Sequence, residues 1–375
     1  MTHRLDDGRT LGLAHDYLTQ RGGAERVVLS LSRSFPGAPI HTTLYDPQGT
    51  YPDFGALDVR ASALNRVGTF RRDHRVALPL LPFASASVRP TEDVVIASTS
   101  GFAHGFHAEG AVIAYCHAPA RWLYQPEAYL GGPMWRGGRG IALGALAPAL
   151  RWWDARAARR PARYLCNSRV VRDRIRDAYG IDARVVPAPH SMDAGAPRTP
   201  VDALADWAGS GYHLVVSRLL PYKNVDLLIE AVRGTGHRLV VVGDGPLRDS
   251  LVGGAPGNVR FVRDLDDAEL RWVYANADTL LAVSLEDYGL TPLEAAAFGV
   301  PSLSLRAGGY LDTVVEGVTG LHVDAAEPGL VRAGLDEAGG HRFDAGALRA
   351  HAAEFSEAGF AQRLRAEVAD LDGGG

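Results

Sequence analysis

Two carboxylates, Glu286 and Glu294, are separated by seven residues across a predicted strand-to-helix turn. The apolar run 279–283 is typical of a buried parallel strand. The sequence TPLE at 291–294 then predicts a helix start, with Thr at N-cap, Pro at N1 and Glu294 at N3. The loop would lie at the carboxyl end of a strand and the positive end of a helix, where open α/β sheets bind ligands and phosphate is favoured. Taken alone, Glu294 is equally well explained as a capping-box residue.

Two cations, Arg218 and Lys223, follow another predicted strand, 213–217, and precede a predicted helix. In one loop at the carboxyl end of a strand, two cations can bind a diphosphate and neutralise the charge that grows as it leaves. For an isolated Arg and Lys pair, a solvated basic loop is the commoner explanation.

The first half of the chain contains a second group of such residues. His15 ends an apolar run, and the adjacent Gly22 and Gly23 precede a predicted helix. Adjacent glycines let the backbone approach a ligand closely and leave its amides unhindered. His117 follows the apolar run 112–116, at a strand end where a sheet presents residues to a ligand. A lone His is more often a structural hydrogen-bonding residue than a catalytic one.

Taken together, these motifs resemble the retaining glycosyltransferases of the family 4 type, which have a GT-B fold, and in particular bacterial mannosyltransferase-like enzymes. The E-x7-E spacing of Glu286 and Glu294 and the R-x4-K spacing of Arg218 and Lys223 occur in the order typical of that family. The resemblance covers nearly the whole chain. It implies that Glu286 lies beside the transferred sugar, that Glu294 hydrogen-bonds the ribose, and that His117 hydrogen-bonds the sugar.

The resemblance implies two overlapping sets of site residues. The catalytic set is Glu286, His117, Arg218 and Lys223. The donor-binding set is Gly22, Gly23, Arg218, Lys223, Glu286, Tyr288, Gly289, Leu290, Thr291 and Glu294. No metal site is expected, because these cations and the helix amides near 289–291 would replace the metal. Asn224 stands where relatives often have another cation, which is expected to weaken or retune diphosphate binding.

Two further glycine-rich turns can each be explained by structure alone. The turn at 243–246 lacks the third glycine of a dinucleotide fingerprint, because Arg248 occupies that place. A turn role there is about as favoured as ligand contact. The turn at Gly308 and Gly309 would lie near the donor, or it merely reverses the chain.

Short apolar runs alternate with amphipathic segments, which indicates parallel α/β architecture. The length of 375 residues suggests about two domains. We expect a GT-B fold with two doubly wound Rossmann-like domains facing a central cleft. The expected boundaries are 1–195 for the acceptor-side domain, 196–350 for the nucleotide-sugar-binding domain, and 351–375 for a helix that the resemblance places on the N-terminal domain. The order of elements in 42–92 is not predicted.

The composition excludes several classes of protein. The net charge of −4 gives no basic footprint for nucleic acid, and two cysteines imply no disulfide framework. No run reaches the roughly 20 apolar residues of a membrane span. A cytoplasmic protein is expected. Residues 132–163, with Trp135, Trp152, Trp153 and several Arg, could make a weak peripheral contact with the inner face of a membrane. A helix with a charged outer face is favoured about two to one.

The expected activity is retaining, metal-independent transfer of a sugar from a nucleotide diphosphate sugar to a sugar, lipid-linked or small-molecule acceptor, without a further cofactor. GDP-mannose is the first choice of donor, and a UDP- or dTDP-sugar is the alternative. Retention would follow from front-face attack, or from an enzyme nucleophile, for which Glu286 is the only obvious residue. Three competing functions are an inactive sugar-nucleotide-binding scaffold, an epimerase of the same fold, and an NAD-dependent oxidoreductase, which the incomplete glycine fingerprint disfavours.

Overall fold

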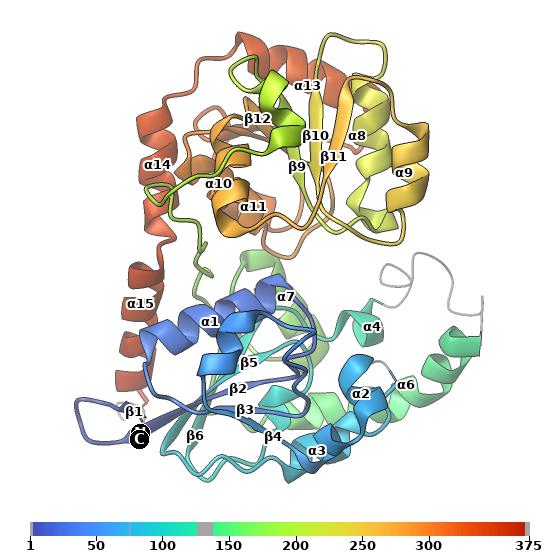
Figure 1. The fold of residues 1–375 in the computed structure, drawn as a ribbon. Helices are drawn as coiled ribbons and strands as arrows, with labels where there is room; N and C mark the ends of the chain where they lie inside the picture. Colours follow the sequence, from blue (N-terminus) through green and yellow to red (C-terminus); the bar gives the residue numbers. More distant parts are fainter. Residues whose placement is uncertain (1–2, 75, 126–137, 372–375) are drawn as a thin grey trace. The chain divides into compact units, whose positions relative to one another are not determined.

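The computed structural model describes residues 3–74, 76–125 and 138–371, with side chains from residue 144 in the last range. The chain divides into two compact units, Met1–Pro189 with Glu357–Gly375, and His190–Ser356. The sequence placed these boundaries after residues 195 and 350. Each unit is built on a parallel sheet with helices packed against it (Figure 1). The predicted α/β class, with two doubly wound domains, is therefore confirmed.

The first unit contains a sheet whose strands are parallel except for β1 (His3–Arg4), which pairs antiparallel with β2. The strand order is β4 (Val59–Ala61), β3 (Ile40–Thr42), β2 (Thr10–His15), β5 (Val94–Thr99), β6 (Ala111–Cys116), β7 (Arg163–Cys166) and β8 (Arg184–Val185). The chain runs from β2 outward to β4 and then returns to β5, so the order reverses between β2 and β5. Such a reversal opens a crevice at the carboxyl ends of the two strands.

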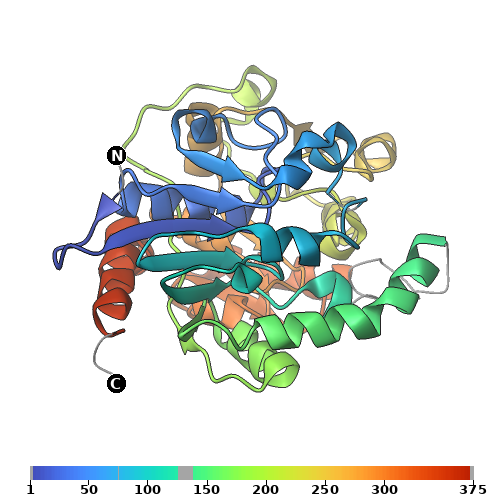
Figure 2. The ribbon, with the colours of Figure 1, turned by 90° about the horizontal axis from the view of Figure 1, so that it is seen from below.

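The helices of this unit include one from the C-terminus. They are α1 (Gly23–Ser34), α2 (Gly68–Arg72), α3 (Leu81–Ser87), α4 (Arg121–Tyr124), α6 (Gly138–Ala157), α7 (Arg169–Tyr179) and α15 (Glu357–Ala369), with 3₁₀ turns η1 (Pro52–Ala56), η2 (Ala63–Arg66) and η3 (Ala103–Gly105). Figures 1 and 2 show α15 beside α1. On α15, three apolar residues at helical spacing, Phe360, Leu364 and Val368, are at most 2% exposed.

The second unit contains a six-stranded parallel sheet. Its order is β11 (Val259–Val262), β10 (Leu239–Val242), β9 (His213–Val216), β12 (Thr279–Ala282), β13 (Ser302–Leu305) and β14 (Gly320–Val323). The order reverses between β9 and β12, as it does between β2 and β5 in the first unit. The second unit therefore has its own crevice position, at the carboxyl ends of β9 and β12.

Helices cover both faces of this second sheet. They are α8 (Val225–Val232), α9 (Arg248–Gly254), α10 (Asp267–Ala275), α11 (Leu290–Ala297), α12 (Tyr310–Thr313), α13 (Pro328–Gly340) and α14 (Ala345–Glu354), with η4 (Asp202–Trp207) and η5 (Pro221–Lys223). Along β10, Val241 packs into a core with α8 and α13, whereas Val240 and Val242 pack into a core with α10 and α11. Burial on both faces explains the continuous apolar run of β10.

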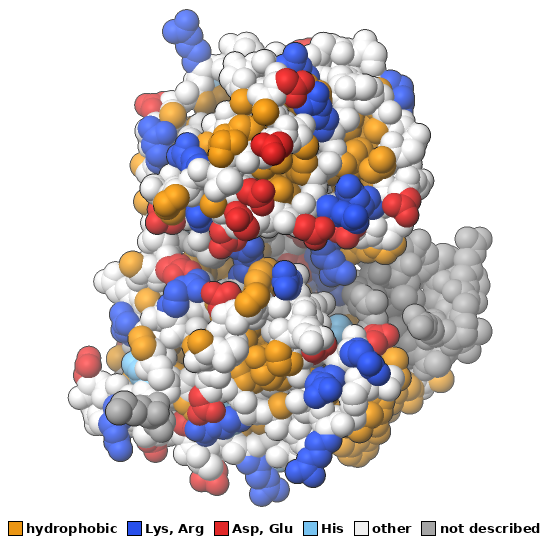
Figure 3. All heavy atoms as spheres, viewed as in Figure 1, with side chains coloured by type: hydrophobic (Ala, Val, Ile, Leu, Met, Phe, Trp, Pro, Cys, Tyr) orange, Lys and Arg blue, Asp and Glu red, His pale blue; other side chains and the backbone are white. Residues whose placement is uncertain are grey.

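The described part of the surface can be compared with the membrane contact considered for residues 132–163. Within the described residues, no helix is both long enough and apolar enough to cross a membrane. On α6, Trp152 is 69% exposed, whereas Arg151 donates hydrogen bonds to the carbonyl of Leu123. Trp135 lies outside the described residues. On the face shown in Figure 3, cationic and anionic side chains are interspersed.

Candidate functional site

The crevice position of the second unit brings together the residues predicted for diphosphate binding. Arg218 and Lys223 follow β9, and Glu286 follows the neighbouring β12. Lys223 Nζ donates to Glu286 Oε1 at 2.6 Å, and the two side chains are 17% and 19% exposed. Strand order therefore explains why residues 63 positions apart form an ion pair at the sheet edge.

Glu286 is held by a second donor. Ser284 Oγ donates to the same Oε1 at 2.7 Å, and the Tyr310 hydroxyl lies 3.2 Å from Ser284 Oγ. Burial and the nearby Glu286 charge raise the pKa of Tyr310 well above its usual range, so its hydroxyl keeps its proton. Oε2 of Glu286 accepts no hydrogen bond from the described part of the chain. One carboxylate oxygen is thus fixed and the other remains available.

Lys223 has a feature that our sequence analysis missed. It is the only lysine of the chain, among 39 lysines and arginines. A lysine differs from an arginine in presenting a compact ammonium with three donors, which contacts phosphate as a point charge. A count of residue types in the sequence would have shown that its single lysine stands at this position.

Arg218 is held by a glycine-rich turn rather than by side-chain contacts. It is exposed, and its side chain forms no hydrogen bond or ion pair with the residues that the structure describes. Its neighbour Leu219 donates from its backbone to Asp244 and accepts from Leu247. A Cβ on Gly243 would lie 1.9 Å from the Ser217 carbonyl oxygen, and one on Gly245 would lie 2.6 Å from that of Leu219. These contacts give both glycines a structural role in placing the Arg218 loop.

Asn224, which stands where relatives often have another cation, has a structural role. Its φ is 56°, in the left-handed region that Asn tolerates better than most residues. Its Nδ2 donates to the carbonyl oxygen of Val283 at 3.0 Å. Asn224 therefore fastens the loop after β9 to the end of β12. Its effect on diphosphate binding remains a prediction.

The predicted start of the helix after β12 is wrong. Helix α11 begins at Leu290, with Gly289 at N-cap in a left-handed conformation at φ 92°. Glu294 therefore lies inside the helix and is no capping-box residue. Its Oε2 instead accepts a hydrogen bond of 2.7 Å from the Tyr274 hydroxyl, and the residue is 7% exposed. Glycine lets the chain turn into the helix earlier than Thr291 would.

The remaining donor-loop residues lie around this helix start. Tyr288 is buried, while Leu290 and Thr291 occupy the first turn of α11 and are partly buried. A Cβ on Gly309 would lie 2.2 Å from Tyr288 Cα, and Gly309 N donates to the Glu286 carbonyl oxygen at 2.9 Å. The glycine turn after β13 thus packs against the backbone of the donor loop and fixes its position.

The crevice position of the first unit contains the predicted histidine. His117 follows β6, and its Nε2 lies 2.8 Å from Ser98 Oγ on β5. Ser98 in turn contacts His15, the last residue of β2. Burial and the neighbouring His15 lower the pKa of His117 to about 3, so its ring is neutral near pH 7. A neutral imidazole can both donate and accept a hydrogen bond.

Gly22 and Gly23 lie at the start of α1 beside a buried acid. Gly22 is the N-cap, and Gly23 is the first helical residue. A Cβ on Gly22 would lie 2.6 Å from Glu25 Oε2. The absence of a side chain at Gly22 is therefore explained by Glu25, whose side chain is 1% exposed. Donor contact by these glycines remains a prediction.

Asp16 organises the loop after β5. Its carboxylate accepts hydrogen bonds from the backbone N–H groups of Ser100, Phe102 and Ala103 and from Thr99 Oγ1. Four donors on one buried carboxylate stabilise its charge. Asp16 therefore positions this loop beside His117.

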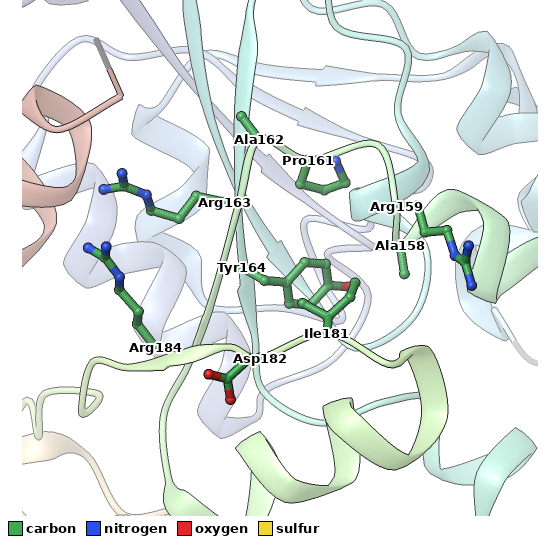
Figure 4. A pocket seen from close by; sticks show the side chains of 9 residues that line it. All are labelled: Ala158, Arg159, Pro161, Ala162, Arg163, Tyr164, Ile181, Asp182 and Arg184. Carbon is green, nitrogen blue, oxygen red and sulfur yellow. The ribbon is translucent and has the colours of Figure 1, made fainter. Parts of the chain in front are cut away.

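A cavity of about 380 Å³ lies elsewhere in the first unit. Figure 4 shows Arg163 and Arg184 on one of its sides and Arg159 on the other. Arg163 and Arg184 both pair with Glu367 of α15 and lie 3.8 Å from Asp370, so two carboxylates compensate their charges. Because these two arginines open β7 and β8, they lie at the amino ends of the strands, at the opposite edge from His117. This cavity is not the predicted site.

Two family models match the chain in succession. Residues 21–194 match the model described as Glycosyltransferase Family 4, and residues 208–338 match the model described as Glycosyl transferases group 1. By these two matches the chain belongs to the glycosyltransferases of the family 4 type. The first match contains the His117 region, and the second contains all the predicted donor residues of the second unit.

Curated relatives of this glycosyltransferase match parts of it. A GDP-mannose-dependent alpha-(1-6)-phosphatidylinositol monomannoside mannosyltransferase of Mycolicibacterium smegmatis is 33% identical over 184 residues, which are 43% of this chain and 48% of the relative. The D-rhamnosyltransferase WbpZ of Pseudomonas aeruginosa is 31% identical over 152 residues, 37% of this chain and 39% of the relative. A glycogen synthase of the same species is 40% identical over 115 residues, 28% of this chain and 22% of the relative. The chain thus spans about half or less of the length of these relatives.

Solved structures match almost the whole glycosyltransferase. Anabaena Alr3699/HepE in complex with UDP-glucose gives a TM-score of 0.70 at 17% identity, covering 96% of this chain and 99% of that chain. Sucrose-phosphate synthase from Thermosynechococcus elongatus gives 0.70 at 15% identity, covering 97% and 100%. Structural similarity at such low sequence identity establishes the fold alone. The predicted GT-B fold class is confirmed.

Proposed function

We propose that this glycosyltransferase transfers a sugar from a nucleoside diphosphate sugar to a hydroxyl acceptor, with retention of anomeric configuration and without a metal ion. The observation that supports the proposal most is the Lys223–Glu286 pair at the strand-order reversal of the second unit. A cation and a carboxylate there, next to a helix start, suit a ligand that combines an anionic diphosphate with sugar hydroxyls.

The diphosphate is bound by Arg218, Lys223 and the backbone amides at 289–291. Lys223 Nζ, which lies 2.6 Å from Glu286 Oε1, can exchange this carboxylate oxygen for a phosphate oxygen, because both are anionic acceptors. Gly289 offers no side-chain cap to α11, so the first amides of the helix are suited to an anion. These donors stabilise the negative charge that develops on the leaving diphosphate.

The two glutamates bind hydroxyl groups. Glu294 Oε2 is occupied by the Tyr274 hydroxyl, which leaves Oε1 to accept from the ribose. Glu286 Oε2 accepts from a hydroxyl of the transferred sugar, and His117 of the first unit hydrogen-bonds the same sugar. Retention follows from front-face attack, with the departing phosphate taking the acceptor proton. Glu286 as a nucleophile is the alternative route.

GDP-mannose is the first choice of donor, because the mannosyltransferase relative is named as GDP-mannose-dependent. A UDP-sugar is the alternative donor, because one structural neighbour is bound to UDP-glucose. A dTDP-sugar is a further alternative. The acceptor is a sugar, a lipid-linked sugar or a small molecule. A weak peripheral contact with a membrane would suit the lipid-linked acceptor, and it remains a prediction.

The first test compares thermal stabilisation by GDP, UDP and dTDP at equal concentration. A ligand that binds only the native protein raises its unfolding free energy by RT ln(1 + [L]/Kd). GDP should stabilise most, and this should persist in the presence of EDTA. Turnover of the matching sugar nucleotide should then give a product with the anomeric configuration of the donor, read from its NMR coupling constants. An inverted product would overturn the retaining mechanism, and no stabilisation by any of the three would overturn the donor site.

A further inference from the structure

Four side chains of the first unit form a continuous series of contacts that ends at His117. Glu25 Oε1 on α1 lies 3.8 Å from His15 Nε2. His15 Nδ1 lies 3.0 Å from Ser98 Oγ and 3.1 Å from the Ser98 carbonyl oxygen. Ser98 Oγ lies 2.8 Å from His117 Nε2. Glu25, His15 and Ser98 are at most 2% exposed, so water does not replace these contacts.

The carbonyl of Ser98 determines which nitrogen of His15 carries a proton. A carbonyl oxygen only accepts hydrogen bonds, so His15 Nδ1 must be the donor in the contact of 3.1 Å. Nδ1 then has no free lone pair. It cannot accept a hydrogen bond from Ser98 Oγ, although the two atoms are 3.0 Å apart.

The Ser98 hydroxyl hydrogen must therefore go elsewhere. Ser98 is 0% exposed, and a buried hydroxyl normally donates to an acceptor. The acceptor within reach, among the residues that the structure describes, is His117 Nε2 at 2.8 Å. An Nε2 that accepts is unprotonated, so the neutral ring of His117 carries its hydrogen on Nδ1. The lowered pKa of His117, about 3, agrees with a neutral ring.

Two nearby carboxylates stabilise the protonated form of His15. Burial by itself lowers the pKa of His15, but Glu25 and Asp16 raise it, and the net direction is upward. Glu25 Oε2 has no hydrogen-bond partner among the described residues. The buried carboxylate is therefore compensated chiefly by His15, which keeps a proton on both ring nitrogens over a wider pH range than a free histidine.

We propose that Ser98, His15 and Glu25 are positioning residues that hold His117 as an Nδ1–H hydrogen-bond donor. The acceptor of that hydrogen bond is a hydroxyl oxygen of the transferred sugar, and this part rests on the proposed function. His117 Nδ1 makes no hydrogen bond within the described part of the chain. The tautomer determines which sugar atoms His117 can bind. A fixed Nδ1–H donor favours a sugar oxygen with a free lone pair, and Nε2 makes no contact with the ligand.

The test reads the tautomer directly. Protein with ¹⁵N-labelled histidine gives long-range ¹H–¹⁵N spectra that distinguish protonated from unprotonated ring nitrogens, and His117→Gln assigns the signals of His117. At pH 7 the wild-type protein should show a protonated Nδ1 and an unprotonated Nε2. A protonated Nε2 in the wild-type protein would overturn the proposal without any variant being needed.

Ser98→Ala supplies the second measurement. In this variant the neutral ring of His117 should be a mixture of both tautomers, including the one with a protonated Nε2. The kcat should fall about tenfold, as expected for one lost hydrogen bond. Ser34→Ala is the matched control, because Ser34 is also buried and its hydroxyl donates to a backbone carbonyl outside this series. An unchanged tautomer in Ser98→Ala would overturn the positioning role. If the tautomer behaves as expected but His117→Gln keeps full kcat, the positioning role stands and the sugar contact of the proposed function fails.

Discussion

Lys223→Met should weaken the binding of a nucleoside diphosphate by about 10- to 150-fold. The substitution keeps much of the length of the side chain and removes the ammonium that pairs with Glu286. Hydrogen bonds to charged groups contribute about 1.5–3 kcal/mol, which converts to that range of affinity. Only a modest discount for solvent screening applies, because the Lys223 side chain is 17% exposed.

The assay is isothermal titration calorimetry with a nucleoside diphosphate and the matching monophosphate. The variant should lose much more affinity for the diphosphate, because Lys223 is assigned to the diphosphate and not to the base or ribose. Arg233→Met is the matched control. Arg233 is a surface cation of the same unit, 45% exposed and paired with Glu230. Diphosphate affinity within twofold of wild type, or an equal loss for both ligands, would refute the assignment.

The unique lysine permits a second assay on the unmutated sequence. Reductive methylation with ¹³C-formaldehyde keeps the positive charge and labels one side-chain amine, Lys223, besides the α-amino group. Its NMR signal should shift on titration with a nucleoside diphosphate and change little with the nucleoside alone. A signal that ignores the diphosphate would place Lys223 outside the binding site.

Three further substitutions test other parts of the site. Gly309→Ala should cost about 1–3 kcal/mol of unfolding free energy in denaturant titrations, because its Cβ would lie 2.2 Å from a backbone atom. Gly329→Ala, where a Cβ meets nothing within 4 Å, should be near neutral. Glu294→Gln should reduce the preference for a ribonucleotide over its 2′-deoxy analogue by about 5- to 10-fold, whereas an unchanged ratio of the two Kd values would contradict a ribose contact. The pKa of His117 is lowered from 6.5 to about 3. The neutral ring of the native state therefore makes its full contribution to the unfolding free energy above pH 6.5, and this contribution decreases as the pH falls towards 3. The difference in unfolding free energy between wild type and His117→Gln should therefore change by up to about 1.4 kcal/mol per pH unit between pH 6 and 4, and a constant difference would count against this.

The sequence predicted the two strands that precede the candidate donor loops. The expected strands 213–217 and 279–283 agree with β9 and β12 to within one residue at each end, because buried parallel strands give continuous apolar runs. The order of the helices and strands in residues 42–92 could not be predicted, because β4 has three residues and the helices nearby are single turns or little more. Such short elements give too few residues for a period to be recognised.

Candidate site residues could be named from the sequence where they follow a strand, and contacts that cross the sheet were missed. Glu286, Lys223 and His117 were named from their places in the sequence and from the family resemblance, and their roles remain predictions. Ser98 was not, because its role depends on two neighbouring strands that bring His15 and His117 to its two sides. The start of α11 was misplaced because Pro at 292 is a strong signal for a first helical position, whereas the turn is made by Gly289.

The same strand-order reversal occurs in both units, yet the charges at the two crevice positions differ. In the second unit the reversal presents Arg218, Lys223 and an uncapped helix start, which favour an anion. In the first unit the start of α1 has Glu25 in its first turn, and Asp16 is also buried there. Two buried carboxylates oppose a phosphate. His15, whose pKa is raised, compensates part of their charge, and His117 is neutral. For the proposed function, electrostatics therefore favours the second unit as the place of the diphosphate and the first unit as a place for uncharged sugar hydroxyls.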